Sequence, residues 1–416
     1  MFNGQAAMRM ATRTIAGIFI ILIAAGLIFQ LQSQIPKERL HSKTTVLNST
    51  SQCASQQTVK KAITANITLG LLLGGIGFDA AGRVYVTDRY SNSLHVLNEF
   101  GSSISSPVVG TDPIAVVVDP NTHLVYVSNR VSDNISVLNG TNLATPAKTI
   151  NGGFRMPTEL ALNPNTNRLY VLNNNSTIVY SPGSYLSVVD TFAGRTVANI
   201  TLPGQPVSLA LNPVTNMIYA TTASRFGGNP NFDVLSVIDG RTNSKVATIP
   251  TTGTVGVNPV TNRIYVANSA VSVFDATNNH LIKSIPVGYA GVEGLSVDTA
   301  RNLIYATSSG SADVSIIDGC TNLVADVVRI GDQHVFSVAV NPGSGIAYLA
   351  GPALLILDDA CRGACISTPN NLIYFILPIA ATGALAGVYL AYRKTVGNKK
   401  FHACFEAEDK GPYFWL

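Results

Sequence analysis

A short apolar motif centred on tyrosine recurs seven times along the middle of the chain. The seven copies are Val84-Tyr85-Val86, Val125-Tyr126-Val127, Leu169-Tyr170-Val171, Ile218-Tyr219-Ala220, Ile264-Tyr265-Val266, Ile304-Tyr305-Ala306 and Ala347-Tyr348-Leu349. Successive tyrosines are separated by 41, 44, 49, 46, 40 and 43 residues. A repeat of that length accommodates four short strands, so seven copies predict an all-β fold, a seven-bladed β-propeller.

The first strand of each repeat alternates large and small residues, which is the period-two pattern of a β-strand. The small positions are Gly77, Val117, Ala161, Ala210, Gly256, Ser296 and Ala339. Because the innermost strands of a propeller converge on its axis, we expect side chains at the crowded position to be small. Asn-Pro-x-Thr-Asn stretches, such as Asn163 to Asn167, predict the turn into the second strand. Asp239-Gly240 and Asp318-Gly319 are expected to turn the third strand into the fourth.

The last repeat stops after its third strand, Ala353 to Leu357. The missing fourth strand is found near the other end of the chain, where Ala65 to Gly70 closely repeats Ala198 to Gly204. We therefore expect the N-terminal segment 58–70 to complete blade seven beside Leu355. Such closure removes the exposed edges that an open array of sheets would leave.

The repeat motifs resemble those of the YVTN (YncE-like) propeller family. Tyr-Val-Ser-Asn at 126–129 and Tyr-Val-Ala-Asn at 265–268 carry the resemblance, together with the Asn-Pro-x-Thr-Asn and Val-Ser-Val-Ile-Asp-Gly elements. The resemblance covers about residues 58–361 and is weakest at 79–82 and 343–345, where the asparagine turn is replaced. It implies the propeller fold of archaeal surface-layer and bacterial periplasmic proteins, and it implies little about activity.

Two uncharged apolar segments flank the repeats and predict membrane-spanning helices at 14–32 and 371–392. Basic residues, among them Arg9, Arg13 and Arg393, lie on the outer flanks, which predicts both termini in the cytoplasm and residues from about 33 to 370 outside. A cleaved signal peptide is the alternative for the first segment. The resulting layout is an N-terminus at 1–13, a linker at 33–57, the propeller at 58–361, a linker at 362–370 and a tail at 393–416.

In an extracytoplasmic location cysteines can form disulfides and asparagine sequons can be glycosylated. The disulfide candidates are Cys53, Cys320, Cys361 and Cys365, with free thiols or a metal site as the alternative; Cys404 is expected inside. The N-glycosylation candidates are Asn48, Asn66, Asn134, Asn139, Asn174, Asn175 and Asn199.

The beginnings of the first strands are expected to surround one mouth of the axial channel. The aligned residues there are Gly75, Ala115, Glu159, Ser208, Thr254, Gly294 and Ser337. The binding candidates at this mouth are Asp112, Arg155, Glu159, Ser208, Glu293 and His334. A plain water-lined channel is the alternative. The histidines lack metal-ligand spacing and the only tryptophan is Trp415, so we predict no catalytic residue, no metal and no cofactor.

These features favour a membrane-anchored, non-enzymatic binding or cell-envelope scaffold protein whose partner is an envelope protein or a glycan. The alternatives are an exported enzyme, either a metal-dependent lactonase-like hydrolase or a redox protein, and a membrane sensor. The formal net charge is only +4 and no concentrated basic face is evident, so nucleic acid is not an expected partner.

Overall fold

A computed structural model describes residues 60–359, apart from 144–147, 176–183, 225–228, 289–290, 309 and 332–333. The predicted membrane segments at 14–32 and 371–392 lie outside the described residues, as do Asn48, Cys53, Cys361 and Cys365. Within the described ranges no helix is both long and apolar enough to cross a membrane.

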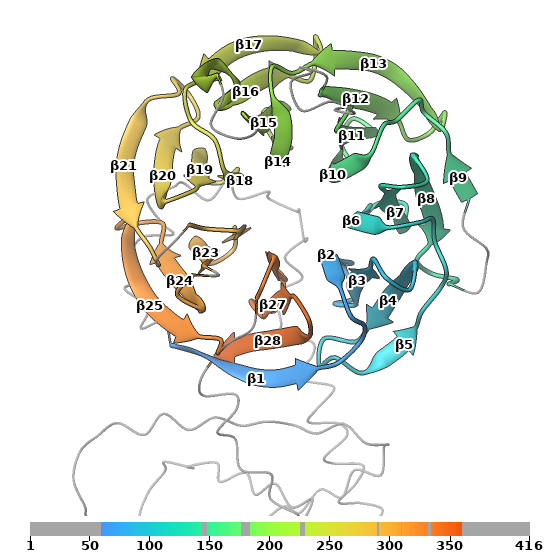
Figure 1. The fold of residues 1–416 in the computed structure, drawn as a ribbon, viewed down its shortest axis with the longest axis horizontal. Coiled ribbons are helices and arrows are strands. Elements are labelled where there is room, and N and C mark those ends of the chain that lie inside the picture. The colour runs from blue at the N-terminus through green and yellow to red at the C-terminus, as the bar shows by residue number, and fades with distance from the viewer. Residues whose placement is uncertain are drawn as a thin grey trace, which may run out of the picture. The chain divides into compact units, whose positions relative to one another are not determined.

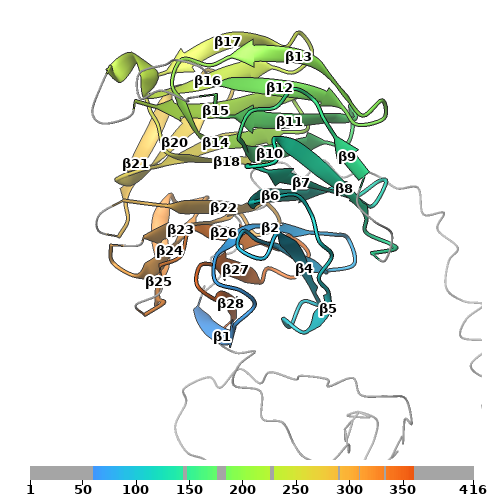
Figure 2. The same cartoon turned by 45° about the vertical axis from the view of Figure 1, so that its right-hand side comes forward.

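Seven four-stranded antiparallel sheets stand around a ring, which confirms the predicted propeller (Figures 1 and 2). Blade one contains β2 (Leu73–Phe78), β3 (Val84–Asp88), β4 (Ser93–Leu97) and β5 (Ser103–Ser105). Blade two contains β6 (Pro113–Val118), β7 (Leu124–Asn129), β8 (Asn134–Asn139) and β9 (Lys148–Ile150). Blade three contains β10 (Pro157–Asn163), β11 (Arg168–Asn173), β12 (Tyr185–Asp190) and β13 (Arg195–Thr201).

The remaining blades repeat the same order from the axis outward. Blade four contains β14 (Gln205–Asn212), β15 (Met217–Ala223), β16 (Val234–Asp239) and β17 (Ser244–Ile249), with a short 3-10 helix at Pro230–Phe232. Blade five contains β18 (Thr254–Asn258), β19 (Arg263–Ala267), β20 (Ala270–Asp275) and β21 (Leu281–Pro286). Blade six contains β22 (Gly294–Asp298), β23 (Leu303–Ser308), β24 (Asp313–Asp318) and β25 (Leu323–Arg329). Blade seven contains β26 (Ser337–Val340), β27 (Ala347–Ala350), β28 (Leu354–Asp359) and β1 (Lys61–Ile67).

Blade seven is assembled from both ends of the described chain, as the repeat pattern predicts. Strand β1 pairs antiparallel with β28, and Asn66 is opposite Leu355. Lys61 holds the beginning of this pair: its buried ammonium lies 2.8 Å from a carboxylate oxygen of Asp359 and donates to the carbonyl of Gly345 at 3.0 Å. Its backbone N–H also donates to Asp326 of blade six at 2.9 Å. The seam is thus joined by strand pairing and by one buried cation.

Each of the seven tyrosines is buried against the next blade around the ring. All seven have exposed fractions of 1% or less. Tyr85 packs with Val116, Val125 and other residues of blade two, and Tyr348 packs with Leu73 of blade one. A tyrosine buries a large apolar area, so these rings supply much of the interface between neighbouring sheets.

The Asn-Pro-x-Thr-Asn turns also join neighbouring blades. The side chain of Asn258 accepts hydrogen bonds from the N–H groups of Val260 and Thr261 within its own turn, at 2.9 and 3.3 Å. Its amide nitrogen donates to Asn302 of blade six at 2.8 Å. Asn302 and its equivalents occupy the left-handed region, with φ of 54° at Asn302. In blades one and seven, where the motif is replaced, Gly82 and Gly345 take this conformation, with φ of 79° and 74°.

An Asp-Gly dipeptide suggests a turn with its glycine in the left-handed region. The turns at Asp239-Gly240 and Asp318-Gly319 are built differently. The left-handed residue is Asn243 or Asn322, each with φ of 54°, and not the glycine. Gly240 is needed for space, because a Cβ there would lie 2.5 Å from the hydroxyl oxygen of Tyr170 of the preceding blade. The glycine therefore accommodates the inter-blade tyrosine.

Removing single tyrosine hydroxyl groups tests how these interfaces are held. The hydroxyl of Tyr348 donates to the carbonyl of Glu99 at 2.7 Å, whereas the buried hydroxyl of Tyr305 has no hydrogen-bond partner among the described residues. We expect Tyr348→Phe to lower the free energy of unfolding by about 1 kcal/mol, because a buried hydrogen bond is lost. Tyr305→Phe should leave it unchanged or slightly raised. Urea unfolding of both variants measures this, and equal losses would contradict the assignment.

Replacing Lys61 tests the seam. We expect Lys61→Met to lower the free energy of unfolding by about 1–3 kcal/mol, because it deletes hydrogen bonds from a buried charged group. Lys60→Met is the matched control, since Lys60 is the exposed neighbour of Lys61. Urea midpoints give the comparison, and a similar loss in both variants would argue against a seam held by Lys61.

Candidate functional site

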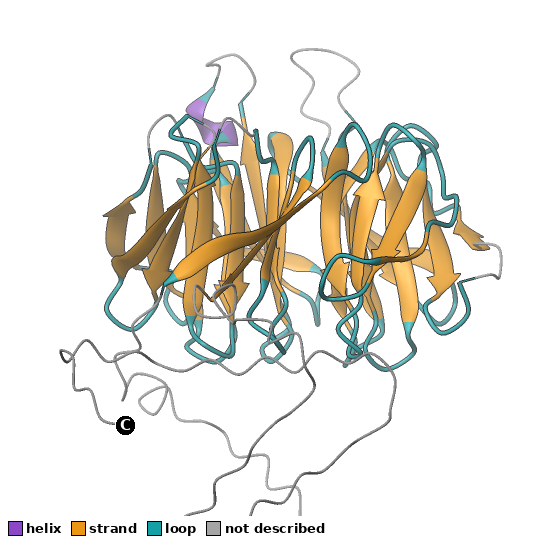
Figure 3. Cartoon of the chain, turned by 90° about the horizontal axis from the view of Figure 1, so that it is seen from below, coloured by secondary structure: helices purple, strands orange, loops and turns teal. Residues whose placement is uncertain are grey.

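The innermost strands surround a cavity of about 420 Å³ on the propeller axis. Its wall includes all seven positions aligned from the sequence, namely Gly75, Ala115, Glu159, Ser208, Thr254, Gly294 and Ser337. The first strands begin at this end of the ring, which we call the mouth face. The opposite face carries the Asn-Pro-x-Thr-Asn turns and is called the turn face; the strands run between the two faces (Figure 3). A cavity of this size accommodates a small ligand.

Close approach of the inner strands forms the cavity wall. A Cβ at Gly75 would lie 2.7 Å from the carbonyl oxygen of Ile114 in the next blade, so only glycine fits there. Hydroxyl groups of the second strands bond to the inner-strand N–H groups: Thr87 accepts from Gly75 at 2.9 Å, and Ser128 accepts from Ala115 at 3.0 Å. These hydroxyl groups therefore satisfy backbone N–H groups of the wall at Gly75 and Ala115.

The surroundings of Glu159 affect the ionisation of its carboxyl group. It follows a bulge near the start of β10, where the register shifts between Pro157 and Glu159. Among the described residues its side chain has no hydrogen-bond partner, and burial raises the pKa of Glu159 to about 7. The carboxyl group is thus divided between its neutral and charged forms near neutral pH.

Glu293 lines the same cavity from blade six. Its backbone N–H donates to the carbonyl of Thr307 at 3.0 Å, and its carbonyl accepts from the hydroxyl of Thr254 at 3.0 Å. Ser208 lies between the two glutamates around the ring and accepts a hydrogen bond from the N–H of Val255 at 3.2 Å. Three of the six binding candidates from the sequence, Glu159, Ser208 and Glu293, are therefore brought together in one wall.

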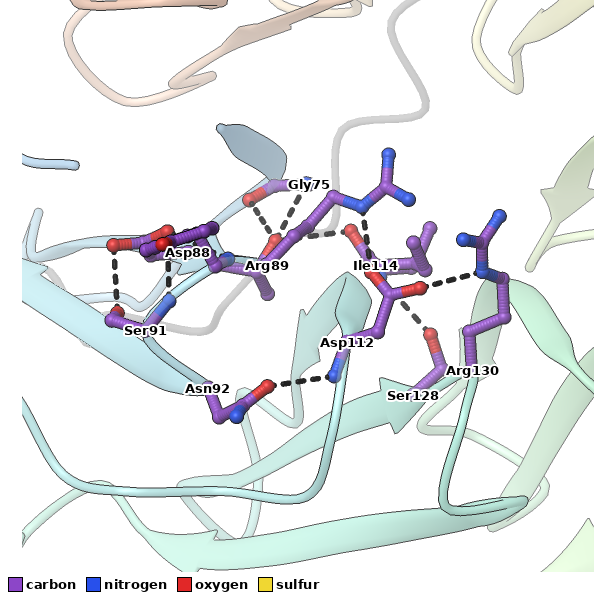
Figure 4. A network of polar contacts seen from close by, with 12 residues as sticks. Gly75, Asp88, Arg89, Ser91, Asn92, Asp112, Ile114, Ser128 and Arg130 are labelled. Carbon is purple, nitrogen blue, oxygen red and sulfur yellow. Dashed lines mark hydrogen bonds and ion pairs between the residues drawn. The ribbon is translucent and has the colours of Figure 1, made fainter. Parts of the chain in front are cut away.

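Asp112 lies between two arginines at the same end of the ring (Figure 4). Its carboxylate oxygens accept from Nε of Arg89 at 2.8 Å and from Nε of Arg130 at 2.6 Å. Asp112 is in the left-handed region, with φ of 56°, and its N–H donates to the side chain of Asn92 at 2.9 Å. Burial acts to raise its pKa, but the hydrogen bonds and charges of the two arginines outweigh burial and hold the pKa of Asp112 below its usual value.

The structure places the other candidates outside the cavity wall. Arg155 and His334 are exposed on the connections that precede β10 and β26. Arg89 also lines the cavity, although it is not among the candidates predicted from the sequence. Arg89 and Arg130 each stand four residues after the repeat tyrosine, in blades one and two. Comparing the residue four positions after the tyrosine in each repeat could have identified both arginines.

The glycosylation and disulfide candidates from the sequence remain predictions. Asn66, Asn139, Asn175 and Asn199 are exposed, whereas Asn134 and Asn174 are partly buried. Cys320 lies in the turn after β24, and its expected partners lie outside the described residues. In the described ranges no three His, Cys, Asp or Glu residues gather as a potential metal-binding group.

Comparisons with known proteins define the class of fold. No family model matches the chain, and no curated protein matches it. Many solved structures share the architecture. One is a chain of hydrazine synthase from Kuenenia stuttgartiensis, with a TM-score of 0.61 and 15% sequence identity over 74% of this chain and 99% of that one. At this identity the likeness shows the fold alone: the protein is a seven-bladed β-propeller with an axial cavity.

The raised pKa of Glu159 predicts a pH-dependent stability. The folded-state pKa of about 7 exceeds the ordinary glutamate pKa of 4.5, so the folded protein binds more protons between these values and loses stability as the pH rises through them. We expect Glu159→Gln to be more stable than the wild type by about 1–3 kcal/mol at pH 8, with the difference vanishing near pH 4. Urea unfolding across this pH range measures it. Ser208→Ala, which alters the same wall without a titrating group, should change the free energy of unfolding equally at every pH. A difference between Glu159→Gln and the wild type that does not vary with pH would contradict the prediction.

Proposed function

We propose that the chain is a non-enzymatic, extracytoplasmic binding or scaffold protein of the cell envelope that uses the mouth face for recognition. In this proposal segments 14–32 and 371–392 anchor it in a membrane and both termini are cytoplasmic. The recognised partner is an envelope protein or a glycan. The fold likeness to hydrazine synthase is compatible with binding and with catalysis alike.

The observation that carries the proposal is the position of the chain ends relative to the cavity. Lys61 pairs with Asp359, so both ends of the described propeller meet at the turn face. The charged residues of the cavity lie near the starts of the first strands, at the opposite face. Anchors connected at Lys61 and Asp359 would leave the mouth face directed away from the membrane and accessible to a partner.

The mouth face also presents apolar side chains around its charged centre. Tyr90 and Val131, in the loops between second and third strands, are 74% and 63% exposed. Phe336, beside the cavity in blade seven, is 48% exposed. A binding surface commonly combines exposed aromatic and aliphatic groups with a few charges.

An exported enzyme is the second possibility, because Glu159 and Glu293 line one cavity. A metal-dependent hydrolase would need further ligands to converge with these two carboxylates. Elemental analysis of the full-length protein purified from its host tests it: stoichiometric metal lost in Glu159→Gln would favour the enzyme over the binding protein.

Site-specific photocrosslinking in the native host tests the binding function. A photoreactive phenylalanine analogue at Phe336 on the mouth face should form an adduct with an envelope protein or glycan. The same analogue at Phe100, which is 65% exposed in the β4–β5 turn on the turn face, is the matched control and should form none. Equal adducts at both positions, or none at Phe336, would contradict recognition by the mouth face.

A further inference from the structure

We infer that Arg89 and Arg130, positioned by Asp112, form a binding site for the carboxylate or phosphate group of a small polar ligand at the mouth of the axial cavity. The inference rests on the proposed binding function of this face and names the chemical class of the ligand. It follows from the hydrogen bonds of the two arginines, from their charge and from the position of Arg89 in the cavity wall.

The two guanidinium groups bond to Asp112 in an unusual way for this propeller. Each uses only Nε, so the terminal nitrogens of both have no hydrogen-bond partner among the described residues. Figure 4 shows both groups turning these nitrogens away from Asp112 toward the same side. Four terminal nitrogens, each with two N–H groups, are therefore available to a ligand on that side.

Other arginine–aspartate pairs in the described ranges use their terminal nitrogens. Arg83 contacts Asp79 through Nη2 and donates to the carbonyl of Gly140 through Nη1. Arg301 likewise binds Asp298 through Nη1 and the carbonyl of Ser344 through Nη2. Those arginines complete turns, whereas the pair at the mouth leaves its planar, paired donors unoccupied.

The net charge of the group favours binding of a further anion. One carboxylate, Asp112, is shared between two arginines, so one positive charge remains uncompensated within the three residues. The arginine side chains are 25% and 36% exposed, so their charges are only partly solvated. Planar guanidinium groups match the geometry of carboxylate and phosphate oxygens, which bind such groups through two parallel hydrogen bonds.

Backbone hydrogen bonds of Asp112 hold this residue in place between the two arginines. Asn92 accepts from the N–H of Asp112, and the N–H of Arg130 donates to the carbonyl of Asp112 at 2.9 Å. Asp112 is thereby fixed in a left-handed conformation between blades one and two. Arg89 lines the cavity, so a bound oxyanion would place the rest of a small ligand on the axis.

Calorimetric titration of the full-length protein tests the inference. The probes are lactate, its neutral analogue lactamide, and inorganic phosphate. We expect lactate or phosphate to bind, and lactamide to bind at least about tenfold more weakly, because it lacks the charge that strengthens the hydrogen bonds. Arg89→Gln and Arg130→Gln should each weaken binding of the anion about tenfold or more.

Arg168→Gln is the matched control. Arg168 forms an ion pair with Asp190 and follows a turn on the turn face, so the variant removes the same charge far from the mouth and should leave the anion affinity unchanged. Circular dichroism establishes that each variant is folded, and the more exposed Arg130 provides the test should Arg89→Gln fail to fold.

Each outcome of the titrations either supports the anion site or overturns it. Preference for lactate over phosphate identifies a carboxylate ligand, and the reverse preference a phosphate; either supports the site when both arginines are needed. Absence of anion binding, equal binding of lactate and lactamide, or loss of stability in the arginine variants without loss of affinity would overturn it and leave a purely structural ion pair. Anion binding without a crosslink at Phe336 would retain the site and reject the proposed macromolecular recognition.

Discussion

The fold depends on burial of one tyrosine per blade against the next blade. A four-stranded sheet with a large aromatic ring on its flank cannot hide that ring by itself, so each blade requires a following neighbour. Only a closed ring gives the last blade such a neighbour, and Tyr348 of blade seven finds it in blade one. Closure in turn requires the seam between β1 and β28, with Lys61 buried at its start. Local sequence repetition and ring closure are therefore parts of a single constraint.

The same constraint separates the two faces of the propeller. On the turn face the asparagine side chains repeat from blade to blade, and Asn163, Asn212 and Asn258 each bond to the asparagine of the following blade. At the mouth face the aligned first-strand positions vary more, ranging from glycine to glutamate. The turn face maintains the geometry of the ring, so residues of the mouth face are free to differ. This division is typical of folds in which a rigid scaffold carries variable loops.

The number of blades, the closing strand and the ring of first-strand residues could all be predicted from sequence, because a repeated pattern averages out local ambiguity. The details of the mouth could not, since they depend on single blades. Arg89 and Arg130 directly follow the second strands of blades one and two, and both bond to Asp112, which has a left-handed conformation between them. Asp112 lies one residue before its first strand and Arg155 two residues before its own, yet Arg155 is exposed. Proximity to a strand along the chain therefore did not distinguish the residue that bonds to two arginines from an exposed one.

The charges at the mouth are distributed unequally around the axis. The arginine pair belongs to blades one and two, whereas Glu159 and Glu293 belong to blades three and six. A small ligand with one anionic group would therefore be attracted to one side of the cavity and repelled from another, which orients it as well as binding it. Because Glu159 is partly neutral near pH 7, this repulsion is weaker in acid than in base. Such selectivity would come from the placement of these charges around the axis, because the arginines and the two glutamates belong to different blades.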